Sequence, residues 1–464
     1  MNNASDIATL QAENAALQAE NAALRQQVTL LGDKVALLLG LLQKSKVKKD
    51  SHNSHLPPAS DIVPQKNQSL RPTSTRKSGG QPGHTGHTLQ FSSTPDVVTD
   101  LKSNFCGRCG TSLAEAAFVL QAVRQVVDIP PVSPVYHEYR QSTAPCPCCQ
   151  EQQSATFPAG VNAPLQYGSR IMALVAYLSV FQYLPYRRLA GCLRDVCGVP
   201  LSEGSVANLL RQAALQAAPV YERIKAELAV SRVVGTDETS AKVNRAKWWV
   251  WVWQNVRNTY LVAAASRGWA TIEGVWSEGL TDATLVSDRW AAHLKMTVRG
   301  HQLCLAHLLR EAIYLTELEG HAVAQGCQDW LRAVFRVRRE IVSRQAALTE
   351  ESAAAQELEQ QLNELLGQTI DPEQQPKTVI FQRALVTHRN SLLPCVYDLE
   401  IPADNNGSER ALRNVKVKEK VSGQFKTGQQ VFCVLRSVID TLRKRDLDIL
   451  THLEEIMQTQ PDTT

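Results

Sequence analysis

The stretch Arg232-Val233-Val234-Gly235-Thr236-Asp237-Glu238-Thr239 places a carboxylate directly after a short run of strand-forming residues. The stretch Ala283-Thr284-Leu285-Val286-Ser287-Asp288 repeats this order further along the chain. Side chains alternate between the two faces of a strand, so Asp237 and Glu238 cannot both point to one site. We select Asp237, because it holds the same position relative to its strand as Asp288. Adjacent ends of two central strands would then bring these two carboxylates together.

A third carboxylate, Glu409, follows Asp404-Asn405-Asn406-Gly407-Ser408 and opens a segment with helical spacing and many positive charges. Arg413 and Lys416 lie four and seven residues later, so the three side chains share one helical face. Two strand aspartates and a helix glutamate can form an oxygen cage for two Mg²⁺ ions, which suits in-line attack on a phosphodiester. Taken alone, each acid is more typical of a cap or a surface ion pair, such as Glu409 with Arg413. Together they predict a nucleic-acid strand-transfer enzyme, with Arg410, Arg413 and Lys416 holding the neighbouring phosphates.

The segment between the two aspartates has strand character followed by a short helix. Tryptophans alternate with valines from Trp249 to Trp253, and Tyr260–Ala265 is another strand candidate. These tryptophans are more typical of sheet packing than of base stacking. A helix over Trp269–Glu278 should precede the strand that ends at Asp288. Three meandering strands, a helix and a fourth strand are the opening of a ribonuclease-H-like fold.

The length of 464 residues is enough for several domains and at least one large buried core. We predict a multidomain α+β protein. Its expected parts are a leucine-zipper coiled coil at 5–43, a flexible basic linker at 44–95, a zinc-binding domain at 96–160, a helical domain of helix-turn-helix type at 161–230, a ribonuclease-H-like α/β catalytic core at 231–304 and 396–445, a helical insertion at 305–395, and a C-terminal tail at 446–464.

Leucine recurs at every seventh position near the N-terminus, at Leu10, Leu17, Leu24, Leu31 and Leu38. The positions three residues earlier hold Ile7, Asn14, Asn21, Val28 and Val35. Leucine at d with β-branched residues or asparagine at a favours a parallel two-stranded coiled coil, because buried asparagines pair across the seam. A lone amphipathic helix packed on its own domain is the alternative. We expect a homodimer or higher oligomer through this segment.

Two C-x-x-C motifs stand some forty residues apart, Cys106-Gly107-Arg108-Cys109 and Cys146-Pro147-Cys148-Cys149. Four thiolates form a tetrahedral site for structural Zn²⁺, and the metal replaces a core that about 45 residues could hardly build. Cys148 is a spare thiol that can replace either neighbouring cysteine as a ligand. Buried free thiols or a redox pair are the alternatives. Between the motifs, Val123–Ile129 and Val135–Tyr139 have strand-like character.

Tyr186–Cys197, the turn Gly198-Val199-Pro200-Leu201 and a second helix over Ser202–Ala213 have the proportions of a helix-turn-helix. Ser202 would cap the second helix. The side chains that would project from it toward DNA are Ser205, Asn208 and Arg211. Helix pairs of this kind also occur in ordinary bundles, so a plain structural role is the alternative.

The formal net charge of +4 gives no bulk electrostatic argument for DNA binding. Positive charge is instead concentrated in two segments, residues 44–90 and residues 410–445. We expect both segments to contact phosphates, although charge runs are also common on ordinary solvated faces. The remaining candidate contacts are Lys46, Lys48, Lys49, Arg76, Lys77 and Lys418.

No charged-then-apolar leader begins the sequence, and the longest apolar run, Ile171–Phe181, is about half of a membrane span. We therefore expect a cytoplasmic, nucleoid-associated protein with no membrane partner. The 11 cysteines are then more consistent with metal ligands or core residues than with a disulfide framework.

Several of these motifs resemble, in order and spacing, the large-subunit transposases of the IS66 insertion-sequence family. Besides the two C-x-x-C motifs, the segments concerned are Gly79–Leu89, Thr236-Asp237-Glu238-Thr239, Ser287-Asp288, Cys304-Leu305-Ala306-His307-Leu308 and Asp404-Asn405-Asn406 with Glu409-Arg410. The resemblance implies a DDE enzyme on a ribonuclease-H-like core. Its implied metal ligands are Asp237, Asp288 and Glu409 for Mg²⁺, and Cys106, Cys109, Cys146 and Cys149 for Zn²⁺.

The resulting hypothesis is a bacterial transposase that cuts the 3′ ends of its element and joins them to target DNA, using two Mg²⁺ or Mn²⁺ ions. Its expected partners are double-stranded DNA of the element ends and the target, further copies of itself, and accessory proteins encoded by the element. The first alternative is a non-catalytic, zinc-containing dimeric DNA-binding regulator. The second is a nuclease that acts on RNA–DNA hybrids.

Overall fold

The computed structural model describes residues 3–47, 49–50, 53–54, 79, 83, 85–86 and 88–458. The chain divides into two compact units. The first comprises Met1–Asn67, Glu138–Gly191 and Leu201–Thr464, and the second comprises Gln68–His137 and Cys192–Pro200. Within the described residues, no helix combines the length and the apolar character that a bilayer crossing needs.

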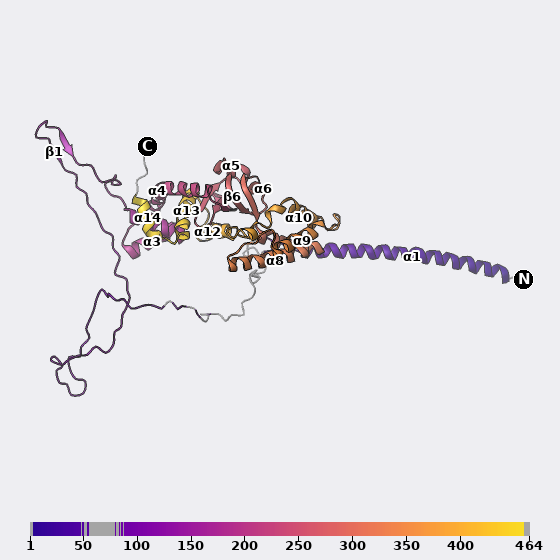
Figure 1. Ribbon diagram of the computed structural model, residues 1–464, viewed down its shortest axis with the longest axis horizontal. Helices are drawn as coiled ribbons and strands as arrows, with labels where there is room; N and C mark the ends of the chain where they lie inside the picture. Colours follow the sequence, from indigo (N-terminus) through magenta and orange to yellow (C-terminus); the bar gives the residue numbers. More distant parts are fainter. Residues whose placement is uncertain are drawn as a thin grey trace. The chain divides into compact units, whose positions relative to one another are not determined.

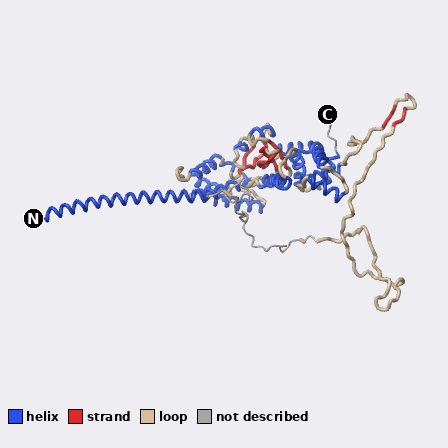
Figure 2. The backbone as a smooth tube through the Cα atoms, turned by 180° about the vertical axis from the view of Figure 1, so that it is seen from behind, coloured by secondary structure: helices blue, strands red, loops and turns tan. Residues whose placement is uncertain are grey.

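A mixed five-stranded sheet is the centre of the α/β part of the first unit, as far as the described residues show. Its strands are β3 (Val233–Val243), β4 (Ala246–Gln254), β5 (Thr259–Ala264), β6 (Leu280–Ser287) and β7 (Val298–Leu303). Their spatial order is β5-β4-β3-β6-β7. The first three form an antiparallel meander, and β6 and β7 extend the sheet in parallel from β3. Figure 2 shows the strands in red with helices on both sides.

The predicted order of three meandering strands, a helix and a fourth strand is confirmed. The helix, α5 (Trp269–Val275), ends three residues earlier than expected, with Trp276 as its C-cap. In β4, the residues from Val250 to Trp253 are all buried, so this strand is covered on both faces. Trp251 and Trp253 stack with ring centroids 6.0 Å apart. Sheet packing is therefore the role of these two rings, as predicted.

The outer edge of β5 is covered by helix α13 (Gln429–Lys444). The backbone N–H of Thr259 donates to Oγ1 of Thr441 at 3.1 Å, and that of Leu261 donates to Oγ of Ser437 at 2.8 Å. A buried strand edge with unpaired N–H groups would be unstable, so these hydroxyls replace a missing strand. The sheet therefore ends at β5 without offering an edge to another chain.

The region predicted as a helical insertion is helical with short connections. It contains α7 (Leu305–Glu319), α8 (Ala322–Arg344), α9 (Ala353–Gly367), α10 (Pro376–Thr387), the 3₁₀ turn η3 (Arg389–Ser391) and α11 (Pro394–Tyr397). Their apolar faces meet in a core that includes Leu309, Trp330, Leu362 and Phe381, and that core continues onto β6 and β7. The chain then enters α12 (Asn406–Ser422), which is followed by α13 and α14 (Ile449–Gln458).

The helices that precede the sheet are α2 (Ser169–Ala176), the π-helical turn η2 (Tyr177–Phe181), α3 (Tyr186–Cys197) and α4 (Glu203–Ala229). The Oγ of Ser202 accepts a hydrogen bond from the backbone N–H of Ser205 at 3.0 Å, so the predicted cap is confirmed. The predicted end at Ala213 is wrong. Buried positions continue as far as Leu228, and this packing extends α4 through Pro219 by four more turns.

The N-terminal segment is one long helix, α1 (Asn3–Lys46), labelled in Figure 1. Of its heptad leucines, Leu17, Leu24 and Leu31 are 58%, 51% and 59% exposed. The side chains of Leu10 and Leu38 lie outside the described residues. The d-position leucines of a coiled coil are buried only by a second chain, so they are exposed in a single chain. The coiled coil therefore stays a prediction.

The strands predicted between the two C-x-x-C motifs are absent from the described chain: Val123–Ile129 and Val135–Tyr139 are irregular. Figure 1 draws the region as a long loop, with β1 (Thr143–Pro145) beyond it; β1 pairs with β2 (Gln152–Ser154). The prediction failed because a strand needs a partner and a buried face. Val126 is 92% exposed, so sequence propensity alone did not produce a sheet here.

Candidate active site

Asp237 and Asp288 lie side by side in the register of the sheet. Strands β3 and β6 are parallel with Gly235 opposite Val286, and two further residues along each chain lead to Asp237 and Asp288. Strand β6 ends at Ser287, as predicted, but β3 continues to Val243. Asp237 therefore lies inside its strand and not at its end, because pairing with β4 holds β3 straight beyond the point where β6 leaves.

Two donors hold the same carboxylate oxygen of Asp288. The backbone N–H of Trp290 donates to Oδ1 at 2.9 Å, and Nδ1 of His293 lies 3.1 Å from the same atom. Burial by itself raises the pKa of Asp288, but the hydrogen bond and charge of His293 lower it to about 2. Burial likewise lowers the pKa of His293, whereas its contacts with Asp288 and Glu238 raise it to about 9. The pair is therefore ionised at neutral pH.

Asp237 has the opposite environment. Burial raises its pKa, and the negative charges of Glu238 and Asp288 raise it further, to about 8. The backbone N–H of Glu238 donates to Oδ1 of Asp237 at 2.9 Å, which offsets only part of this effect. Asp237 thus retains a proton near pH 7 when no cation is present. A divalent cation at this position would relieve the repulsion among the carboxylates.

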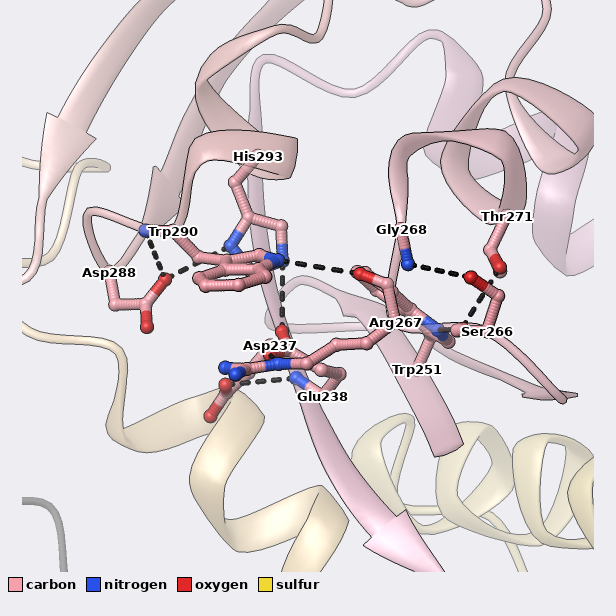
Figure 3. A network of polar contacts seen from close by, with 10 residues as sticks. All are labelled: Asp237, Glu238, Trp251, Ser266, Arg267, Gly268, Thr271, Asp288, Trp290 and His293. Atoms are coloured by element: carbon pink, nitrogen blue, oxygen red, sulfur yellow. Dashed lines mark hydrogen bonds and ion pairs between the residues drawn. The ribbon is translucent and has the colours of Figure 1, made fainter. Parts of the chain in front are cut away.

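Glu238 is buried on the other side of the His293 ring from Asp288, and each of its oxygens has a charged neighbour (Figure 3). Its Oε1 lies 2.6 Å from Nε of Arg267, and its Oε2 lies 3.2 Å from Nε2 of His293. The choice of Asp237 over Glu238 as the metal ligand stays a prediction, but Glu238 is not remote from the site. Through His293 it is connected to Asp288, because the histidine ring spans the space between the two carboxylates.

Glu409 lies in the first turn of α12 and contacts helix α7. Its Oε1 is 3.6 Å from Nε2 of His307 and 3.5 Å from Nη2 of Arg310. The charge of His307 also contributes to the low pKa of Asp288, so this histidine lies between two of the predicted metal ligands. Among the described residues Glu409 forms no ion pair with Arg413, which was the alternative role considered for it.

Helix α12 begins in close contact with β3, and two glycines permit the contact. A Cβ on Gly235 would lie 2.6 Å from Nε2 of Gln254, and a Cβ on Gly407 would lie 2.5 Å from the same atom. The buried Asn405 fastens the junction: its Nδ2 donates to the carbonyl oxygen of Thr236 at 2.6 Å. This bond joins the residue before Asp237 to the start of the helix that carries Glu409.

Asp237, Asp288 and Glu409 share one property within the described structure. Each has one oxygen in a polar contact (Oδ1, Oδ1 and Oε1) and a second oxygen without a protein partner. Carboxylate oxygens are the ligands that Mg²⁺ and Mn²⁺ prefer, so these residues fit such ions. The described residues contain no group of three or more ligands already arranged around a metal position, so binding requires side-chain movement.

A family model for the transposase IS66 family matches residues 164–431. The chain belongs to this family. The matched span covers the whole five-stranded sheet and the helices through α12, and it therefore includes Asp237, Asp288 and Glu409. A comparison with curated proteins found no match.

Sequence reasoning gave no role to four side chains that surround the carboxylates of this transposase: Arg267, His293, His307 and Arg310. His307 was part of a motif that carried the resemblance, but nothing in its spacing connected it with Glu409. His293 follows Asp288 by five residues on the one-turn helix α6 (Ala291–Leu294), and this spacing was the only available signal.

The cations of α12 that were predicted to bind DNA fall into two groups. Arg410 and Arg413 are exposed, and no ion pair holds either one among the described residues. Lys416 donates to the carbonyl oxygen of Ser240, and Lys418 donates to that of Gly423 at 3.0 Å. Burial lowers the pKa of Lys418 to about 8. The second pair therefore also contributes to the packing of the transposase fold, and its contact with DNA stays a prediction.

The other predicted DNA contacts differ in how they are placed. Asn208 and Arg211 are exposed on α4 and bonded to each other at 2.6 Å, whereas Ser205 is half-buried beside the cap. Lys49 is exposed, and its Nζ lies 5.0 Å from the ring centre of Tyr314. Lys48, Arg76, Lys77 and the side chain of Lys46 lie outside the described residues.

A cavity of about 430 Å³ opens beside Asp288. Four cations line it, Lys49, Arg267, Arg289 and Lys377, together with the ring of Trp290 and the carboxylate of Glu311, which pairs with Arg289. A wall of this kind can balance the charge of a phosphate and cover the face of a base.

The two C-x-x-C motifs form matching turns. The backbone N–H of the first cysteine donates to the carbonyl oxygen five residues later, and its own carbonyl accepts from the N–H four residues later, at 2.8–2.9 Å in both turns. Cys109 thus corresponds to Cys149, and Cys148 corresponds to Arg108. A hydrogen bond with Thr111 lowers the pKa of the Cys109 thiol to about 7, and backbone bonds of the neighbouring cysteines lower that of Cys146.

Proposed function

We propose that this transposase cuts the 3′ ends of its insertion sequence and joins them to target DNA, with Asp237, Asp288 and Glu409 holding two Mg²⁺ or Mn²⁺ ions. The main support is the uncommitted oxygen that each of these carboxylates retains. They come from β3, from the end of β6 and from the first turn of α12, which the Asn405 contact fastens to β3. Membership of the transposase family supports the same assignment.

The proposed reaction needs no covalent enzyme intermediate. Bound Mg²⁺ would lower the pKa of the attacking water and stabilise charge on the phosphate. Attack by water on phosphorus would release a 3′-hydroxyl at the element end, and that hydroxyl would then attack a target phosphodiester. Arg310 and His307 would hold Glu409 in place and add positive charge near the phosphate. Arg410 and Arg413 would contact the neighbouring DNA backbone.

We further propose that the sheet and α12 are a ribonuclease-H-like catalytic core. The strand order β5-β4-β3-β6-β7, with its antiparallel meander and two parallel strands, supports this. The helices before the sheet would form the DNA-binding domain, reading the element ends through Ser205, Asn208 and Arg211. The basic linker with Lys46, Lys48, Lys49, Arg76 and Lys77, and Lys416 and Lys418 on α12, would follow the DNA backbone.

A structural zinc ion on Cys106, Cys109, Cys146 and Cys149 is part of the same proposal. The matching backbone of the two turns supports Cys149, and not Cys148, as the partner of Cys146. The lowered thiol pKa values of Cys109 and Cys146 favour the thiolate that zinc binds. Pairing of two chains through α1 would bring two element ends together, with accessory proteins of the element as further partners and the bacterial nucleoid as the place of action.

The decisive experiment uses the full-length protein and labelled DNA that carries the terminal inverted repeats flanking its gene. We expect Mg²⁺-dependent nicking at the 3′ ends, and its loss in Asp237→Asn, Asp288→Asn and Glu409→Gln, with DNA binding retained. The matched control is Asp282→Asn, because Asp282 is exposed on the same strand that leads to Asp288. Strand transfer by the Asp237→Asn protein would refute the assignment. Binding without nicking by the natural protein would favour a non-catalytic regulator.

A further inference from the structure

We propose that His293 is a positioning residue of the catalytic centre: it fixes Asp288 through Oδ1 and so selects Oδ2 as the oxygen that binds the divalent cation. The proposal rests on the proposed function, because it takes Asp288 as a metal ligand. It adds a residue that is outside the three carboxylates and that would touch neither the metal nor DNA.

The His293 ring lies directly beside Asp288. His293 is completely buried on α6, the single helical turn that follows Asp288. Its Nδ1 lies 3.1 Å from Oδ1 of Asp288, and because an ionised carboxylate only accepts, the ring is the donor. The N–H of Trp290 donates to the same oxygen at 2.9 Å. Two donors on Oδ1 leave Oδ2 as the oxygen without a partner among the described residues.

The His293 ring also has a charged neighbour at its other nitrogen. Nε2 of His293 lies 3.2 Å from Oε2 of Glu238, and Oε1 of Glu238 lies 2.6 Å from Nε of Arg267. The edge of the ring meets Trp251 in a T-shaped contact at 5.7 Å between centroids. Figure 3 shows this row of side chains from Arg267 to Asp288. Nδ1 therefore has a hydrogen bond, Nε2 has a charged neighbour without hydrogen-bond geometry, and the ring has an aromatic neighbour. Together these contacts restrain the ring against turning away from Asp288.

Arg267, which binds Glu238, is itself held by aromatic neighbours. The guanidinium of Arg267 lies 3.9 Å from the ring centre of Trp290 and 5.0 Å from that of Trp249. It therefore has two aromatic neighbours in addition to its bond to Glu238. Glu238 and His293, the two buried charged groups of the row, cost desolvation energy that an apolar core would avoid. This row of side chains is explained if it orients Asp288 as a metal ligand, because residues that hydrogen-bond to metal ligands fix the geometry of those ligands.

Two substitutions test the contacts of the two ring nitrogens separately. In His293→Asn the amide nitrogen takes the position of Nδ1 and can still donate to Asp288. In His293→Gln the amide reaches the position of Nε2, which keeps the contact with Glu238 and loses the one with Asp288. His293→Gln should therefore weaken Mn²⁺ binding about 10–100-fold, and His293→Asn by no more than about threefold. The matched control is His137→Gln, since His137 is exposed in the other unit.

The probe is Mn²⁺ alone, titrated into the full-length protein and followed by electron paramagnetic resonance, with thermal unfolding in EDTA measured in parallel. A structural role alone would lower the stability of both variants and leave Mn²⁺ affinity equal. If His293→Gln does not fold, Glu238→Gln replaces it: like His293→Asn it keeps the Nδ1 contact with Asp288, so Mn²⁺ binding should weaken by no more than about threefold. A larger loss would show that Glu238, and not the Nδ1 contact, sets the affinity, and would overturn the positioning role.

The outcomes distinguish this proposal from the one it rests on. Equal Mn²⁺ affinity in the natural protein and His293→Gln, or equal weakening in His293→Gln and His293→Asn, would overturn the positioning role alone. Failure of the natural protein to bind Mn²⁺ would overturn the metal assignment of Asp288 and this inference with it. Restored affinity on going from His293→Gln to His293→Asn is the supporting result.

Discussion

Replacing Asp237 and Asp288 by asparagine should change the stability of the metal-free protein in opposite directions at pH 7. The two side chains are neighbours in the register of β3 and β6 and have the same proposed role. Their surroundings differ, because Asp237 faces two like charges whereas Asp288 is held by His293. Metal-free stability therefore reports each carboxylate's environment independently of catalysis.

The signs follow from the pKa values. Asp237 has a pKa of about 8 in the folded protein against 3.8 in the reference state, so its protonated form favours the folded protein. This contribution to the free energy of unfolding is fully present below pH 3.8 and is lost as pH rises toward 8. At pH 7 the loss is at most about 4 kcal/mol at 1.36 kcal/mol per pKa unit, and about 2 kcal/mol with solvent screening. Asparagine does not titrate, so Asp237→Asn should be more stable by this amount.

Asp288 shows the reverse dependence. Its pKa of about 2 lies below the reference value of 3.8, so it contributes stability above pH 3.8 that is lost as pH falls through 2. The shift corresponds to about 2 kcal/mol at neutral pH. Asp288→Asn should lose this amount, because its amide oxygen can still accept from His293 but no longer carries the charge that pairs with the imidazolium.

The assay is thermal unfolding of the natural protein and the two variants at pH 5, 6, 7 and 8 in EDTA. We expect a melting temperature several degrees higher for Asp237→Asn at pH 8, a much smaller difference at pH 5, and a lower melting temperature for Asp288→Asn throughout. Saturating Mg²⁺ should stabilise the natural protein more than either variant. An Asp237→Asn protein no more stable than the natural one at pH 8 would show that the carboxylates are not crowded.

Three further predictions concern other parts of the chain. Purified protein should contain one zinc ion per chain by elemental analysis, and Cys146→Ser should lose it whereas Cys148→Ser retains it; equal loss in both would contradict the pairing of the turns. Leu24→Ser should shift the oligomer toward monomer in sedimentation experiments, because a polar side chain at a d position weakens the seam; an unchanged mass would argue against the coiled coil. Gly407→Ala should push the Gln254 side chain off its contacts with Ser408 and Lys444, cost about 1 kcal/mol and reduce cleavage, whereas Gly274→Ala meets no atom within 4 Å and should be neutral or slightly stabilising in unfolding experiments.

Much of the fold could be predicted because many of its elements depend on patterns of residues that are close in sequence. The β-branched run before Asp237, the alternating Trp251 and Trp253, and the serine cap at Ser202 each depend on residues close in sequence. The same holds for the long N-terminal helix. The predictions that failed, such as strands at Val123–Ile129 and a short α4, depended on packing partners that local patterns do not specify.

The candidate site divides in the same way. The three carboxylates were selectable because each follows a recognisable strand or opens a charged helix. The partners of those carboxylates were not, because His307 and Arg310 stand about a hundred residues before Glu409 and meet it only through the packing of α7 against α12.

The sequence by itself determined the order of the strands and helices, the turns at the cysteines and the identity of the acids, since these follow from propensity, spacing and residue chemistry. Tertiary structure alone decided which oxygen of each acid is engaged and which of the adjacent Asp237 and Glu238 is buried in an ion pair. It also raised the pKa of Asp237 and lowered that of Asp288. The physical reason is that desolvation and Coulomb interaction depend on distance in space, which the folded chain sets independently of distance along the sequence.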